Sequence, residues 1–175
     1  LLAQRYEQIV EYATIRPRIG YDRPMARTRW LDPDEMRAWR TYITTSVDLM
    51  KALEADVAPY GITMGDYQLL AMISEAPDSR LRLCDLADQL RLTRGGLTRR
   101  MDGVLRLTLV RRVQDERDRR VAFAELTTKG WSLLKKVAPI HLDSVRRLMI
   151  DHLSRAEIKA LGTAFGKIEK NLRES

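Results

Sequence analysis

Residues 93–130 decide the fold, and they read TRGGLTRRMDGVLRLTLVRRVQDERDRRVAFAELTTKG. Apolar side chains recur at helical spacing over 93–107, which predicts an amphipathic helix that begins after a threonine cap. Two runs rich in β-forming residues follow, 109–114 and 121–126, with the charged turn 115–120 between them. A helix followed by a strand, a basic loop and a second strand is typical of a winged helix-turn-helix.

Positive charge is concentrated in this part of the chain. Residues 91–120 hold ten arginines, four acids and no lysine, which is a balance of +6 in a chain of net charge +7. Positive charge this localised indicates a surface that binds a polyanion. Arginine side chains favour planar, forked contacts to phosphates and guanine edges. The alternative is an ordinary solvated charged face. We favour the polyanion surface because the arginines fall within a structural motif.

Length and composition bound the remaining possibilities. A chain of 175 residues, 45% hydrophobic, can bury a core as one domain or as a domain with an assembly extension. Seven methionines and only two phenylalanines favour a mostly helical protein. The single cysteine, Cys84, excludes an internal disulfide framework and fits a reducing cytoplasm. No run of apolar residues is long enough to span a membrane, and the pI near 9.8 favours nucleic acid or an anionic surface as the partner.

The chain is expected to fall into four parts. Residues 1–30 predict a short amphipathic helix and a basic linker, and 31–62 predict one long helix that starts at an Asp-Pro cap. Residues 63–128 form the predicted winged helix-turn-helix lobe, and 129–175 predict two more long helices. The expected fold is therefore mainly α with a small β-hairpin wing, and the long helices outside the lobe are expected to form a dimerisation region.

Three segments of the chain resemble the MarR family of bacterial regulators. They are the run LRLCDLA at 81–87, the run TRGGLTRRMD at 93–102, and the wing 109–120 joined to its exit LTTKG at 126–130. The resemblance implies a homodimeric transcriptional regulator, usually a repressor, that binds palindromic double-stranded DNA and is released by a small effector. The alternative is a non-specific DNA-architectural protein without effector control.

The predicted recognition helix supplies most of the expected DNA contacts. A helix in the major groove presents mainly its N-terminal residues to base edges, so we expect Arg94, Thr98 and Arg99 to contact bases or adjacent phosphates. Arg100 and Arg106 are expected on phosphates. Gly95 and Gly96 either let the backbone approach DNA closely or simply weaken the helix start. The predicted set is Thr93, Arg94, Gly95, Gly96, Thr98, Arg99, Arg100 and Arg106.

The resemblance also assigns roles in the wing. It implies that Arg120 enters the minor groove while Asp118 orients its guanidinium, and that Arg117 and Arg119 clamp the backbone or supply the tip instead. Asp115 and Asp118 have a second interpretation, in which they bridge to neighbouring arginines within the wing, and both interpretations can hold together. The predicted wing set is Asp115, Arg117, Asp118, Arg119 and Arg120.

One position departs from the family pattern. The family closes its recognition helix with glycine, but this chain has Thr108 there. Threonine is poor at the left-handed conformation that glycine provides, so the end of the helix and the angle of the wing are expected to differ.

By resemblance, an effector pocket is expected where the first long helix meets the lobe. Trp39 and Tyr42 would stack an aromatic or phenolic compound, and Arg40 would pair with its carboxylate beside Thr45. The alternative is that these aromatics belong to the core.

Catalysis and metal binding are not expected. His141 and His152 lie eleven residues apart with no nearby cysteine, so we expect solvated or dimer-face histidines and no metal site. Cys84 is expected at a helix cap as a small, partly buried thiol, and a redox role has little support. No catalytic constellation or cofactor motif occurs, so the predicted class is a non-enzyme without cofactors.

Overall fold

The computed structural model describes residues 29–174, so most of the predicted N-terminal helix and basic linker lies outside the described residues. Contacts divide the chain into two units, 1–40 and 41–175. In the first unit, Asp32 caps helix α2 (Pro33–Val57): its Oδ1 accepts the backbone N–H groups of Asp34 (2.8 Å) and Glu35 (2.9 Å). The predicted Asp-Pro helix start is confirmed.

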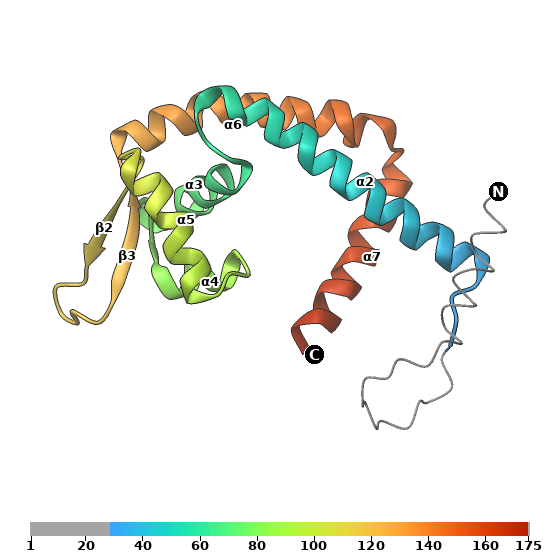
Figure 1. Ribbon diagram of the computed structural model, residues 1–175, viewed down its shortest axis with the longest axis horizontal. Coiled ribbons are helices and arrows are strands. Elements are labelled where there is room, and N and C mark those ends of the chain that lie inside the picture. Colours follow the sequence, from blue (N-terminus) through green and yellow to red (C-terminus); the bar gives the residue numbers. More distant parts are fainter. Residues whose placement is uncertain (1–28, 175) are drawn as a thin grey trace, which may run out of the picture. The chain divides into compact units, whose positions relative to one another are not determined.

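The second unit holds the remaining elements (Figure 1). After α2 they are η1 (Ala58–Tyr60), α3 (Met64–Glu75), η2 (Pro77–Ser79), β1 (Arg80–Arg82), α4 (Leu83–Gln89), α5 (Arg94–Arg106), β2 (Val110–Gln114), β3 (Ala122–Leu126), α6 (Thr128–Leu148), η3 (Ile150–His152) and α7 (Arg155–Glu174). This order confirms the predicted class, mainly α with a small β wing.

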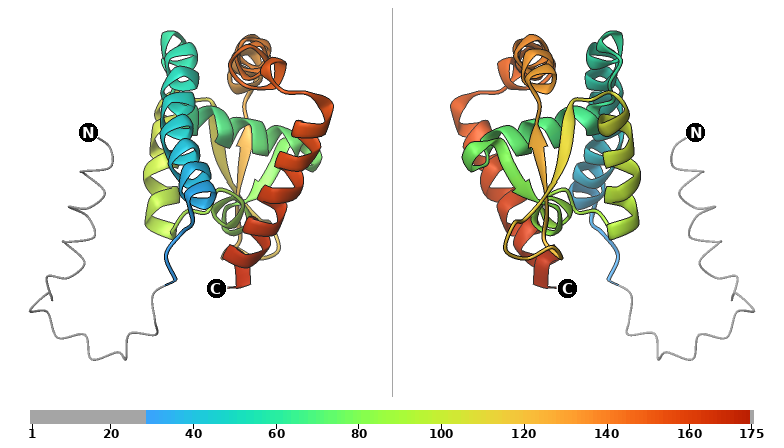
Figure 2. Two further views of the ribbon diagram at one scale, coloured as in Figure 1. Left: turned by 90° about the vertical axis from the view of Figure 1, so that its right-hand side faces the viewer. Right: turned by 90° about the vertical axis from the view of Figure 1, so that its left-hand side faces the viewer.

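The wing is part of a three-stranded antiparallel sheet. Its order is β1-β3-β2, so the short strand β1 pairs with β3 on the side away from β2. Arg111 lies opposite Glu125 in the β2–β3 register. Beyond that pair, β2 and β3 run out from the helices as a narrow hairpin (Figures 1 and 2).

One apolar core joins the lobe to the long helices. Fully buried side chains come from α2 (Val57), α3 (Leu70), α4 (Leu86), α5 (Val104) and α6 (Val137). Since each helix contributes one apolar stripe at helical spacing, the side chains meet in one interior that excludes water. Leu97 and Met101, predicted on the inner side of the recognition helix, are also buried.

Helix ends follow the capping residues in the sequence. Ser154 and Glu157 form a capping box at the start of α7, with Ser154 N donating to Glu157 Oε2 at 2.7 Å. Thr63 and Asp66 form another at α3. Helix α6 starts at Thr128 after its cap Thr127 and ends at Leu148, and a 3-10 turn follows it.

Thr108 adopts the left-handed conformation despite its Cβ, with φ 56°. Its carbonyl accepts the Thr127 hydroxyl at 2.7 Å, and Lys129 Nζ donates to Leu107 O at 2.9 Å. Leu109 N donates to Val104 O at 2.9 Å, the bond that closes a helix with a left-handed cap. The expectation of a different helix ending is therefore wrong. These contacts offset the roughly 1–2 kcal/mol that a left-handed L-residue costs.

The exit from the wing requires a glycine. A Cβ on Gly130 would lie 2.1 Å from Leu109 O, so the first turn of α6 packs directly on the chain that enters β2. Among the described residues, no helix is both long and apolar enough to cross a bilayer.

Candidate nucleic-acid interface

Helix α5 presents a basic outer face. Thr93 caps it by accepting Gly96 N at 3.1 Å, and no acid lies in its first turn, so the positive end of the helix dipole is not neutralised. Arg94 and Arg99 are exposed, and their guanidinium groups form no hydrogen bond or ion pair within residues 29–174. These two guanidinium groups are therefore available to an external anion.

Two other predicted contacts of α5 are partly engaged by the helix itself. Thr98 Oγ1 donates to Arg94 O at 3.0 Å, and Arg106 Nε donates to Asp102 O at 3.2 Å. The Thr98 hydroxyl keeps its acceptor capacity, and the Arg106 guanidinium keeps its terminal nitrogens. Both side chains are exposed, so both remain compatible with the predicted roles.

Arg100 does not project freely from α5. The side chain is half-buried, and its guanidinium lies against Gly65 in the first turn of α3. A Cβ on Gly65 would lie 1.1 Å from Arg100 Nη1, so the position of this guanidinium depends on the glycine. No carboxylate of residues 29–174 pairs with it. Sequence reasoning missed Gly65, because nothing local links it to α5.

The two glycines of α5 differ in their surroundings. A Cβ on Gly95 would meet no atom within 4 Å, whereas one on Gly96 would lie 3.3 Å from Thr93 Oγ1. Gly96 therefore belongs to the cap, and Gly95 is the bare backbone position on the outer surface.

Asp118 and Arg120 form a forked pair in the wing turn. Asp118 Oδ1 accepts the Arg120 backbone N at 2.9 Å and Nε at 3.1 Å, and Oδ2 accepts Nη2 at 3.2 Å. The hydrogen bonds from Arg120 lower the pKa of Asp118, so the carboxylate stays charged. The Arg120 side chain is 92% exposed, so it is held in direction and open to an outside partner.

Asp115 builds the turn. Its Oδ1 accepts the backbone N–H of Arg117 at 2.8 Å and of Asp118 at 3.0 Å, and these bonds lower its pKa. Arg117 and Arg119 are exposed and make no ion pair in the described part of the chain. Within the described residues, Asp118 bridges to the Arg120 side chain as the bridging interpretation expects, whereas Asp115 bonds to backbone groups and not to an arginine side chain.

Not all of the ten arginines contribute to this field. Arg111 Nη2 donates to Glu125 Oε1 at 2.6 Å across the sheet, which raises the pKa of Arg111. Arg91 Nη2 lies 3.0 Å from Glu169 Oε1 on α7. Both acids lie outside 91–120, so the sequence count included charge that the fold neutralises.

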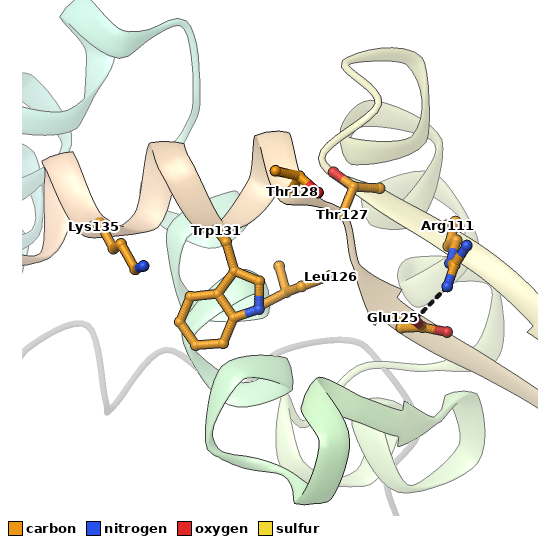
Figure 3. A pocket seen from close by; sticks show the side chains of 7 residues that line it. All are labelled: Arg111, Glu125, Leu126, Thr127, Thr128, Trp131 and Lys135. Atoms are coloured by element: carbon orange, nitrogen blue, oxygen red, sulfur yellow. Dashed lines mark hydrogen bonds and ion pairs between the residues drawn. The ribbon is translucent and has the colours of Figure 1, made fainter.

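A cavity of about 650 Å³ lies where the wing joins α6 (Figure 3). Trp131 and Lys135 project into it from α6, the Arg111–Glu125 pair borders it on the strands, and Leu126, Thr127 and Thr128 complete its lining. Lys135 Nζ lies 5.9 Å from the Trp131 ring centroid. This cavity was not predicted.

A second cavity, of about 630 Å³, lies among α2, α3, α4 and α6. Tyr67 and His141 line it with their ring centroids 4.5 Å apart, and burial lowers the pKa of His141 while Asp56 opposes that shift.

The residues predicted to form an effector pocket do not meet at this cavity, since neither Tyr42 nor Thr45 lines it. Tyr42 is exposed and contacts Phe165 at 5.5 Å between centroids, and in the first unit Trp39 and Arg40 are exposed. The predicted pocket stays a prediction.

Two minor expectations are corrected. Helix α4 begins at Leu83 and Arg82 occupies its N-cap position, so Cys84 lies inside the helix and is not a cap. Cys84 is also exposed and not partly buried. His141 is packed against Tyr67, and its Nδ1 is buried with no hydrogen-bond partner among residues 29–174, so it is not a solvated histidine. His152 is exposed, as expected.

Comparison with known proteins supplies relatives along most of the chain. No protein-family model matches it. The structure of AbsC, a MarR family transcriptional regulator from Streptomyces coelicolor, is 39% identical, with a TM-score of 0.82 over 85% of this chain and 100% of that one. Sco3205, a MarR family regulator of the same organism solved in complex with DNA, is 32% identical, with a TM-score of 0.80 over 83% of this chain and 92% of that one.

A sequence relative carries a regulatory role in its name. The HTH-type transcriptional repressor YetL of Bacillus subtilis (strain 168) is 25% identical over 141 residues, which is 79% of this chain and 84% of that protein.

Proposed function

Since the chain belongs to the MarR family of transcriptional regulators, we propose that it binds palindromic duplex DNA as a homodimer and represses transcription until a small molecule releases it. The recognition surface is α5 with the wing. The observation that carries this proposal is a set of three exposed guanidinium groups. Those of Arg94 and Arg99 on α5 pair with no acid of residues 29–174, and that of Arg120 on the wing is oriented by Asp118.

Major-groove and minor-groove contacts divide between the two elements. The N-terminal part of α5 fits the major groove, where a forked arginine such as Arg99 discriminates guanine. The wing turn fits the flanking minor groove, where Arg120 senses the potential and the width of the groove. Arg100, Arg106, Arg117 and Arg119 are the proposed phosphate contacts.

The dimer uses helices on both sides of the lobe. Ile168 (53% exposed) and Leu172 (71%) lie on α7, which buries no residue in a single chain, and Leu142 (60%) lies on α6. Exposed Ile43 and Val47 continue an apolar face along α2. Long amphipathic helices with apolar faces open to solvent favour a second copy as their cover. Two lobes about 34 Å apart would contact half-sites one turn apart.

Repression is supported by a relative, and release by a cavity in this chain. YetL carries the name of a repressor, and the similarity to it covers 79% of this chain and 84% of that protein. The cavity among α2, α3, α4 and α6 lies between the long helices and the lobe, so a ligand there can change how the lobe is held. We prefer it as the effector site to the exposed aromatics of α2.

The decisive experiment selects bound sequences from random duplex DNA and then compares one selected palindrome with random duplex at fixed salt. We expect at least about a thousandfold preference for the palindrome. Equal affinity for both duplexes would replace this proposal with the DNA-architectural alternative. Absence of binding to either duplex would reject both.

A further inference from the structure

The cavity among α2, α3, α4 and α6 is mainly apolar and rich in thioethers. Four methionines line it, together with five aliphatic side chains from the same helices. The full lining is Leu49, Met50, Leu53, Met64, Tyr67, Gln68, Ala71, Met72, Glu75, Gln89, Leu90, His141, Val145 and Met149. Methionine side chains adapt to ligands of different shape and make favourable contacts to aromatic rings. A volume of about 630 Å³ suits a small organic molecule.

Charge is distributed unevenly around this cavity. Among the described residues that line it, Glu75, the last residue of α3, is the only side chain that is charged at neutral pH, and none is a lysine or an arginine. Burial lowers the pKa of His141, which keeps its ring neutral. Glu75 acts on Tyr67: burial first, and then this carboxylate, raise the pKa of the Tyr67 hydroxyl. The formal charge that the described lining presents at neutral pH is therefore the exposed carboxylate of Glu75, which is negative.

An anionic ligand would meet Glu75 and find no countercharge. A cation would find the carboxylate, the face of the Tyr67 ring and several polarisable sulfur atoms. We propose that this cavity binds a hydrophobic cation, an amine whose apolar body fills the space between the methionines while its ammonium group pairs with Glu75. As an effector site it rests on the proposed function, but binding of the amine itself requires no DNA.

The cavity beside the wing has the opposite character and serves as an internal comparison. Its charged lining is Arg111, Lys135 and Glu125, a balance of +1. An aromatic anion that binds this protein is expected there, so the two sites can be separated by substitution.

The test is calorimetric titration of the full chain with three probes of similar shape: 1-naphthylmethylamine, 1-naphthalenemethanol and 1-naphthoate. At neutral pH these are a cation, a neutral compound and an anion. We expect the amine to bind at least about tenfold more tightly than the alcohol. Glu75→Gln should weaken the amine about fivefold or more and leave the alcohol within about twofold.

Two control variants test whether the amine binds in this cavity and whether the loss of any surface charge changes its binding. Asp143→Asn removes an exposed carboxylate from α6 that does not line the cavity, and it should leave amine binding unchanged. Lys135→Gln should abolish any binding of naphthoate at the cavity beside the wing without affecting the amine.

Three results would overturn the proposal. The first is failure of the amine to bind. The second is naphthoate binding in Lys135→Gln that is as tight as binding of the amine. The third is a preference for the amine over the alcohol that persists in Glu75→Gln. DNA binding measured without a probe is a separate readout, so failure of this proposal is distinguishable from failure of the proposed function.

Discussion

Replacing Gly65 with alanine should weaken DNA binding through Arg100, a residue on another helix. The new Cβ would lie 1.1 Å from Arg100 Nη1 and 2.2 Å from Cζ. The obstructed atoms are the end of a flexible side chain, so the guanidinium is expected to move while both helices keep their places. Arg100 then loses the position from which it contacts a phosphate.

The magnitude follows from counterion release. Each phosphate contact contributes about 0.9 to the slope of log affinity against log salt, so the four proposed contacts in each lobe of a dimer predict a slope of about −7. Loss of one contact in each lobe should make that slope shallower by about 1.8. At about 0.1 M salt each lost contact costs at most about eightfold in affinity. Stability should change in the opposite direction, because alanine is better than glycine in a helix by up to about 1 kcal/mol.

The assay is a double-mutant cycle with Gly65→Ala and Arg100→Gln, measured by DNA-binding anisotropy over a range of salt and by thermal unfolding. The two single variants should lose similar affinity, and the double variant should lose little more. Gly103→Ala is the matched control, because its Cβ would make only an ordinary 3.7 Å contact with Asp66 Oδ1. Unchanged affinity in Gly65→Ala, or a loss that persists in the Arg100→Gln background, would refute the reasoning.

Four further outcomes are expected. Arg99→Ala should cost about 1–3 kcal/mol on the selected palindrome and much less on random duplex, as measured by competition; equal losses would make it a phosphate contact. Asp118→Ala should weaken binding because it releases the aimed Arg120 guanidinium, whereas tighter binding on every duplex would show that the pair has no aiming role. Ile168→Glu should give a monomeric mass by light scattering at micromolar concentration, and an unchanged dimer would exclude α7 from the interface. Since burial lowers the pKa of His141 in the folded chain, the unfolded chain binds its proton first, and stability should fall as pH drops below about 6.5. Thermal unfolding of His141→Gln should show a smaller fall, and an equal fall would assign the effect to other groups.

Local features were predictable because they depend on neighbours along the chain. Thr93 caps α5 and Ser154 with Glu157 caps α7, since a capping side chain reaches only two or three residues ahead. The pair of Asp118 with Arg120 also spans only two residues, and the family resemblance implied it.

The sequence by itself determined the order of the elements, the inner face of each helix and the position of the basic surface, because periodicity and charge are properties of the chain. Only the tertiary structure decided which charges stay available to an external anion. Glu125 neutralises Arg111 across the sheet, and the absence of a side chain on Gly65 lets the Arg100 guanidinium lie against α3. It also decided that Thr108 keeps a left-handed conformation, through Thr127, and that four helices enclose a cavity with one carboxylate. These outcomes depend on side chains that are distant in sequence and meet only when the core packs, so no local pattern records them.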